Sequence, residues 1–217
     1  MLDRGTTKMT RQEIKDEFDK LKARASIFGS ASTVTVSIET TGPNLAETLK
    51  LVSHVLKDAS FPADEFEKLK NERIAGIESQ RTEPQAVASI RLQKYTSPYP
   101  KGDPRYAEDF DESLASIKAL KLDDLKKFHK DFYGANNGTL AISGAFNTAE
   151  INSVITEQFG NWKSPANFKR LEARIKKVQP IDEKLETPDK ANAFFLAQYT
   201  WEYSDSEPDY AALELGQ

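Results

Sequence analysis

The segment at residues 121–162 constrains the fold more than any other part of this 217-residue chain, because residues typical of turns and helix ends mark its boundaries. Phe132-Tyr133-Gly134 closes a predicted helix, and Asn137-Gly138 is a dipeptide typical of tight turns. The apolar run Leu140-Ala141-Ile142 predicts a short buried strand, and Asn147 opens a second helix. We therefore predict a helix, a turn, a strand and a helix, in this order.

The sequence before this segment also alternates between helical and strand patterns. Thr10 and Glu13 form the motif of a capping box, which predicts a helix running to about Arg24. Residues 33–39 alternate apolar and polar side chains, as a half-buried strand does, and we expect an earlier strand at residues 26–30. Four more helices are predicted, from residues 42–44 to Leu56, from Pro62 to Ile77, from Pro84 to Tyr95, and from a cap at Asp111 to Ala119.

These elements predict an α+β fold. We expect a two-layer sandwich in which helices cover one face of a mainly antiparallel sheet, with strands near 26–41 and 136–145.

A proline-rich and charged stretch divides the chain after this fold. We place one domain at residues 1–170, a linker at 171–187 and the start of a second, similar domain at 188–217. In this last part, residues 195–203 alternate aromatic and small or polar side chains, which predicts a second strand region. A helix begins near Pro208 as the chain stops, and we infer that a longer protein was truncated here.

Composition excludes several classes of function. The net charge is −4 and both signs are well mixed, so we expect no nucleic-acid partner. The chain has no cysteine, which excludes disulfides, thiolate zinc sites and a cysteine nucleophile. No apolar run approaches the ~20 residues that a membrane-spanning helix needs.

Several short blocks, in this order and spacing, resemble the zinc metallopeptidases of the pitrilysin/insulinase family. The blocks are Gly5-Thr6, Phe61-Pro62 with Glu65-Phe66, Pro98-Tyr99-Pro100 with Gly102 to Tyr106, Phe132 to Gly134, Phe159-Gly160 with Trp162, Thr187 to Ala193, and Pro208-Asp209-Tyr210. The resemblance covers nearly the whole chain and is greatest to the second, non-catalytic half of double-length bacterial members.

This resemblance implies the metallohydrolase fold of the family, which mitochondrial processing peptidases share. It also implies that residues 1–170 are most of the third domain of a longer protein, whose other half binds zinc. The partners that it implies are that catalytic half of the same polypeptide and a peptide substrate. The family resemblance favours a periplasmic location.

The residues that would hold zinc in the family are not found in this chain. The family uses an H-x-x-E-H helix and a glutamate about six residues after a Glu-Arg pair. No H-x-x-E-H occurs here, and counting from Glu72-Arg73 leads to Ser79, with Glu78 beside it. Because serine is a poor zinc ligand, we expect no catalytic residue and no metal site, and we interpret Glu78 as a solvated carboxylate.

Only two histidines could serve as imidazole ligands. His54 lies opposite the apolar stripe of its helix, so we expect it to face water. His129 lies at the edge of an apolar face, and we expect it to be partly buried with a hydrogen-bond partner. Together with Glu78, His129 is the candidate for a metal ligand, although we favour a structural role for both.

Three hypotheses follow for the function. The first is a non-catalytic half of a zinc endopeptidase, which forms the chamber wall and helps to bind peptide. The second is a peptidase domain active by itself, in which His54, His129 and Glu78 or Glu72 bind metal. The third is a non-proteolytic scaffold subunit of the same fold. We also expect the truncated chain to expose sheet edge or apolar surface and to self-associate.

Overall fold

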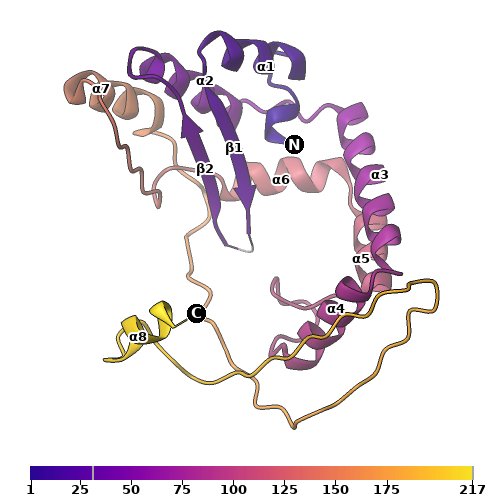
Figure 1. Ribbon diagram of the computed structural model, residues 1–217. Helices are drawn as coiled ribbons and strands as arrows, with labels where there is room; N and C mark the ends of the chain where they lie inside the picture. The colour runs from indigo at the N-terminus through magenta and orange to yellow at the C-terminus, as the bar shows by residue number, and fades with distance from the viewer. Residues whose placement is uncertain (31, 217) are drawn as a thin grey trace. The chain divides into compact units, whose positions relative to one another are not determined.

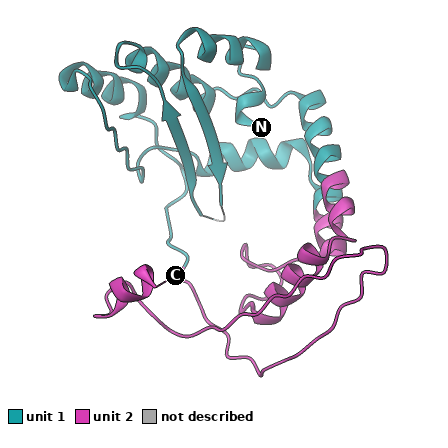
Figure 2. Ribbon diagram, viewed as in Figure 1, with its two compact units in different colours: residues 1–73, 117–171 teal, residues 74–116, 172–217 magenta. Residues whose placement is uncertain are grey.

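The computed structural model describes residues 1–30 and 32–216. The chain forms two compact units, each built from two separate stretches (Figure 2). Unit 1 consists of residues 1–73 and 117–171, and unit 2 of residues 74–116 and 172–217.

Unit 1 contains a β-hairpin and most of the helices (Figure 1). Its elements are η1 (Leu2–Arg4), α1 (Arg11–Lys20), β1 (Arg24–Gly29), β2 (Val34–Glu39), η2 (Gly42–Asn44), α2 (Leu45–Lys57), the first part of α3 (Ala63–Gln80), the end of α5 (Phe110–Ala119), α6 (Leu122–Phe132) and α7 (Thr148–Phe159). The predicted capping box at the start of α1 is confirmed. Thr10 N donates to Glu13 Oε2 at 2.7 Å, and the Thr10 hydroxyl accepts from Glu13 N.

The two predicted strands pair as an antiparallel hairpin, in a register from Arg24 opposite Glu39 to Gly29 opposite Val34. Alternation places one set of side chains toward the helices, as predicted for residues 33–39. This set consists of Ala25, Ile27, Val36 and Ile38. They pack against the buried cluster that contains residues of α2, and partly buried residues of α6 pack against the same cluster, so helices cover one face of the hairpin (Figure 1).

Helix α2 is the centre of the core of unit 1. The predicted apolar stripe is buried, with Leu49, Val52 and Leu56 all at most 7% exposed. Helix α7 packs beside α2, and Leu49 joins Ile151 and Val154 of α7 in a second apolar cluster. Burial of this stripe is the main force that holds α2 and α7 together.

The predicted strand at residues 136–145 is wrong, and so is the larger sheet. Among the described residues the sheet has two strands. Ile142 does pack near Leu49 and Ile151, so the apolar signal was real. Residues 139–145, however, make no backbone–backbone hydrogen bond to any described residue. A strand requires a neighbouring edge as well as an apolar pattern, and no such edge lies within hydrogen-bonding reach.

Unit 2 contains the rest of α3, α4 (Pro84–Thr96), the start of α5, and α8 (Tyr210–Leu215). The predicted cap at Asp111 is wrong by two residues. Asp109 Oδ1 accepts from Glu112 N at 2.9 Å, and Asp109 N donates to Glu112 Oε2 at 3.2 Å. Both Asp109 and Asp111 suit a helix start, and tertiary contacts of Asp109 with Lys94 decide between them.

The predicted strand at residues 195–203 is also wrong. This stretch is extended but makes no backbone–backbone hydrogen bond within the described chain. Its pattern is that of a strand, but the described residues of unit 2 contain no strand that could pair with it.

None of the helices in the described residues has the length and apolarity that crossing a membrane requires.

Candidate functional site

Glu78, the candidate nearest to the expected position of a zinc ligand, is exposed on α3 in unit 2. Its carboxylate forms an ion pair with Arg81, at 3.0 Å between Oε2 and Nε. The neighbouring Ser79 hydroxyl donates to the Gly76 carbonyl of its own helix at 2.9 Å. Each side chain therefore has a local structural partner.

His54 does not face water as predicted, because its side chain is only 19% exposed. Its Nε2 lies 2.8 Å from the Thr6 hydroxyl, and its Nδ1 lies 2.8 Å from Asp58 Oδ2. The prediction considered only the helix that carries His54. It missed the N-terminal segment, which folds over α2 and brings the buried Thr6 to the ring.

The hydrogen bonds of Thr6 define the proton positions in this network. The Thr6 hydroxyl oxygen accepts from Met9 N at 3.0 Å and from Lys8 N at 3.3 Å. Its one proton is then free to be donated to His54 Nε2, and His54 donates from Nδ1 to Asp58. Both ring nitrogens are occupied, so His54 holds the N-terminal segment to α2 and has no free lone pair for a metal.

His129 is partly buried with a hydrogen-bond partner, as predicted. Its Nε2 donates to the Leu56 carbonyl at 2.6 Å, which joins α6 to the end of α2. The ring contacts Phe61 edge to face at 5.4 Å and Tyr133 at 4.8 Å between ring centres. Burial raises the pKa of the Tyr133 phenol above its ordinary value. These contacts fix the ring inside an apolar environment.

Among the described residues, no group of three or more histidine and carboxylate side chains is placed to hold a metal ion. His54 and His129 belong to unit 1 and Glu78 belongs to unit 2. Glu72 of unit 1 lies 4.0 Å from Arg4, so its nearest charged neighbour is a cation. The residues present therefore do not fit the three-ligand set that hydrolytic zinc requires.

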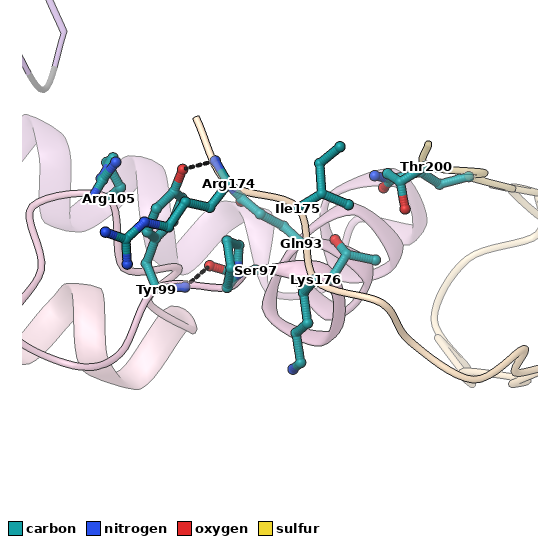
Figure 3. A pocket seen from close by; sticks show the side chains of 11 residues that line it. Gln93, Ser97, Tyr99, Arg105, Arg174, Ile175, Lys176 and Thr200 are labelled. Atoms are coloured by element: carbon teal, nitrogen blue, oxygen red, sulfur yellow. Dashed lines mark hydrogen bonds between the residues drawn. The ribbon is translucent and has the colours of Figure 1, made fainter. Parts of the chain in front are cut away.

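Unit 2 has a cavity of about 220 Å³ between the end of α4, the loop that follows it and two extended segments (Figure 3). The ion pair of Asp103 with Arg105 forms one side of it. The two make paired bonds of 2.9 Å and 2.8 Å, and these bonds lower the pKa of Asp103 to about 2. The Arg105 guanidinium also stacks on the Tyr99 ring at 3.9 Å.

The extended segment that follows Glu172 is fastened to the same loop. Arg105 donates to the Glu172 carbonyl at 2.6 Å, and Arg174 N donates to the Tyr99 hydroxyl at 3.0 Å (Figure 3). Lys176 donates to the Tyr95 carbonyl at 3.0 Å. The residues near 174 were assigned to the linker at 171–187, so these contacts were not predicted. The cavity is open and is lined by the basic side chains of Arg105, Arg174 and Lys176, and its lining carries no nucleophile with an adjacent base.

A second cavity of about 850 Å³ lies in unit 1, around the N-terminal segment and the start of α3. Glu65 holds two cations there, with Arg4 at 2.8 Å and Arg11 at 3.5 Å. The hydrogen bond to Glu65 raises the pKa of Arg4 above its ordinary value. This cavity is a wide surface depression lined by both cationic and anionic side chains.

Comparisons with known proteins point to one peptidase family. Residues 119–217 match the family model described as "Peptidase M16 inactive domain". Comparison with curated protein sequences gives no match.

Solved structures agree with this match. The peptidase M16 inactive domain from Pseudomonas fluorescens is 25% identical, with a TM-score of 0.60 over 82% of this chain and 42% of that one. A protease from Helicobacter pylori is 16% identical, with a TM-score of 0.62 over 81% of this chain and 42% of that one. The periplasmic protease PqqL from Escherichia coli is 14% identical, with a TM-score of 0.59 over 81% of this chain and 20% of that one. The chain therefore spans less than half the length of each of these proteins.

Proposed function

We propose that this chain belongs to the M16 peptidase family and is the non-catalytic half of a zinc metalloendopeptidase, because residues 119–217 match the family model of an inactive domain. In this role it forms part of the wall of a chamber and contributes to peptide binding, while another half of the same polypeptide holds zinc and cleaves. The observation that carries the proposal is the match of residues 119–217 to the inactive domain of the family.

The arrangement of the side chains supports this proposal. Both histidines take part in structural hydrogen bonds, and Glu78 is paired with Arg81. A hydrolytic zinc ion needs about three ligands and an open position for water, and no such set occurs among the described residues. The proposal includes the metallohydrolase fold and the division into a domain at 1–170, a linker at 171–187 and the start of a similar domain at 188–217. It also includes a periplasmic location, because PqqL from Escherichia coli is a periplasmic protease.

Zinc content and peptide cleavage by the purified chain test the catalytic part of the proposal. We expect less than ~0.1 zinc ion per chain after dialysis. We also expect no EDTA-sensitive cleavage of a quenched fluorescent peptide library. Stoichiometric zinc together with EDTA-sensitive cleavage would contradict the proposal.

Peptide binding requires a separate measurement. Fluorescence anisotropy of labelled peptides of ~20 residues should show saturable binding to the chain, with an affinity in the micromolar range or weaker. A matched chain unfolded in urea is the control for non-specific adsorption. If no peptide in a varied set binds saturably, the chain has no part in holding substrate, even when the zinc and cleavage results agree with the proposal.

A further inference from the structure

The stretch at residues 172–190, which we name the strap, runs along α4 in unit 2. It forms no helix and no strand. Hydrogen bonds and ion pairs connect it to α4, to the residue before α4 and to the loop after it. As the strap proceeds from Glu172 to Lys190, its partners move back along the chain from Arg105 to Glu83, so it runs antiparallel to α4. A stretch expected to be mainly a linker is therefore attached to a helix along its length.

The first part of the strap, residues 172–179, is held mainly through backbone groups. Two of its bonds, those from Arg105 and to Tyr99, are the ones described above for the loop after α4. The Gln179 carbonyl also accepts from the Tyr95 hydroxyl at 2.9 Å. Each of these bonds has a neutral carbonyl or hydroxyl as its acceptor. Dissolved salt therefore screens them less than it screens an attraction between two exposed charges.

Ion pairs connect the second part of the strap, residues 181–190, to α4 and to the residue before it. Glu183 pairs with Arg91 at 2.9 Å, and Lys190 pairs with Glu83 at 2.6 Å. The four side chains are between 31% and 51% exposed. The residues on either side of Glu183 are exposed as well, so little apolar packing supports these pairs.

The charges of the two segments are complementary. Residues 181–189 contain four carboxylates and one lysine, whereas the charged side chains of α4 are Arg91 and Lys94. An exposed ion pair shifts an equilibrium by a factor of only ~1.5–5. Salt also shortens the reach of such attraction, from ~10 Å at 0.1 M to ~3 Å at 1 M. The second part is therefore held weakly and by forces that depend on salt.

We propose that the strap is a conformational device in two parts, a fixed anchor at residues 172–179 and a latch at residues 181–190 that opens as the ionic strength rises. In the closed state the latch lies along α4. In the open state it leaves α4, while the anchor keeps its bonds up to Gln179. Opening then frees the chain after Pro180 to move relative to α4. This inference goes beyond the proposed function and does not depend on it.

Electron paramagnetic resonance with pairs of spin labels tests the device, since the chain has no cysteine of its own. One label is placed at Ser89→Cys, which is exposed on α4, and the second at Leu185→Cys in the latch or at Ala173→Cys in the anchor. Distances between labels at 89 and 185 should be narrowly distributed in ~20 mM salt and broadly distributed in ~500 mM salt. Distances between labels at 89 and 173 should be the same at both concentrations.

Substitutions of single charges test which contact closes the latch. Glu183→Gln should lower the ratio of closed to open chains by ~1.5–5-fold in ~20 mM salt. The matched control is Asp182→Asn, because Asp182 is the next residue, is exposed and loses the same charge. The control should change the ratio less than Glu183→Gln does. Exchanging the partners in Arg91→Glu/Glu183→Arg should restore the closed state, and circular dichroism establishes that the variants keep their helices.

Three results would overturn the proposal. Distances between positions 89 and 185 that are equally broad or equally narrow at both salt concentrations would show that charge does not hold the latch. Distances between positions 89 and 173 that broaden in the same way would show that the strap leaves α4 as one unit. Equal effects of Glu183→Gln and Asp182→Asn, with no recovery in the exchanged variant, would exclude the pair of Glu183 with Arg91 as the closing contact.

Discussion

Replacing Thr6 with valine removes the centre of the network that attaches the N-terminal segment to α2. Thr6 is 6% exposed, and its hydroxyl bonds His54 Nε2 at 2.8 Å and Met9 N at 3.0 Å. Valine has nearly the same shape, so the change leaves no large cavity and isolates the effect of the hydroxyl. The ring nitrogen and the backbone N–H then lose their partners.

The expected cost follows from the number of groups left without a partner. An unsatisfied buried group costs ~1–3 kcal/mol, and access of water at this partly buried site reduces that value. For two such groups we expect Thr6→Val to lower the free energy of unfolding by ~2–3 kcal/mol. With a urea dependence of ~2 kcal/mol per molar, the unfolding midpoint falls by ~1–1.5 M.

Urea unfolding, followed by circular dichroism at 222 nm, measures this change. The matched control is Thr7→Val, because Thr7 is the next residue, is exposed and has the same side chain. The control should shift the midpoint by less than ~0.3 M. A double-mutant cycle with His54→Ala should also show a coupling of ~1 kcal/mol between residues 6 and 54. If the two valine variants had equal unfolding midpoints, or if residues 6 and 54 showed no coupling energy, the hydrogen bonds of Thr6 would not stabilise the fold as we infer.

Three further predictions concern the core, a close backbone contact and pH. Leu49→Ala, at the contact of α2 with α7, should cost ~2–5 kcal/mol in urea unfolding, and a cost below ~1 kcal/mol would contradict the core described above. Gly42→Ala should destabilise the chain in the same assay, because its new methyl carbon would lie 2.4 Å from a backbone oxygen, whereas Gly76→Ala on an open face of α3 should stabilise it by ~0.5–1 kcal/mol. Hydrogen bonds lower the pKa of Glu112 to about 2, and the bond from Lys94 has the largest effect. The contribution of Glu112 to stability is therefore present above the ordinary glutamate pKa of ~4.3 and is lost as the pH falls toward 2. Limited proteolysis of the loop at residues 97–109 should therefore accelerate between about pH 4 and pH 2. Glu112→Gln should be cleaved faster already at pH 7 and should reduce this dependence, and Asp103, whose pKa is also lowered to about 2, should account for the remainder.

The sequence was sufficient where one segment of chain decides its own structure. The capping box of Thr10 and Glu13, the apolar stripe of α2 and the alternation of β2 are all short-range patterns, and all are present in the structure. Helices satisfy their backbone hydrogen bonds internally, so a correct local pattern is enough to predict them. The hairpin was predictable for a similar reason, because its two strands are neighbours in sequence.

The sequence was insufficient where a distant segment decides the outcome. Residues 136–145 and 195–203 have the composition of strands, but a strand exists only when another edge accepts its hydrogen bonds. The environment of His54 was wrongly predicted for the same reason, since its partner Thr6 comes from a segment 48 residues away. The bond of Arg105 to the Glu172 carbonyl was also missed, because Glu172 lies 67 residues away in the sequence.

The same distinction explains why the stability of unit 1 does not depend on a metal ion. The residues of unit 1 that hold its helices together are apolar stripes and a few polar contacts, such as the bond from His129 to the Leu56 carbonyl. None of these contacts needs a cation, so the core places no constraint on whether a zinc ligand or Ser79 occupies an exposed turn of α3. Substituting an exposed helix residue typically changes stability by less than ~0.5 kcal/mol, whereas losing one of three zinc ligands removes hydrolysis. A substitution at an exposed position of α3 can therefore remove a ligand and leave the fold intact.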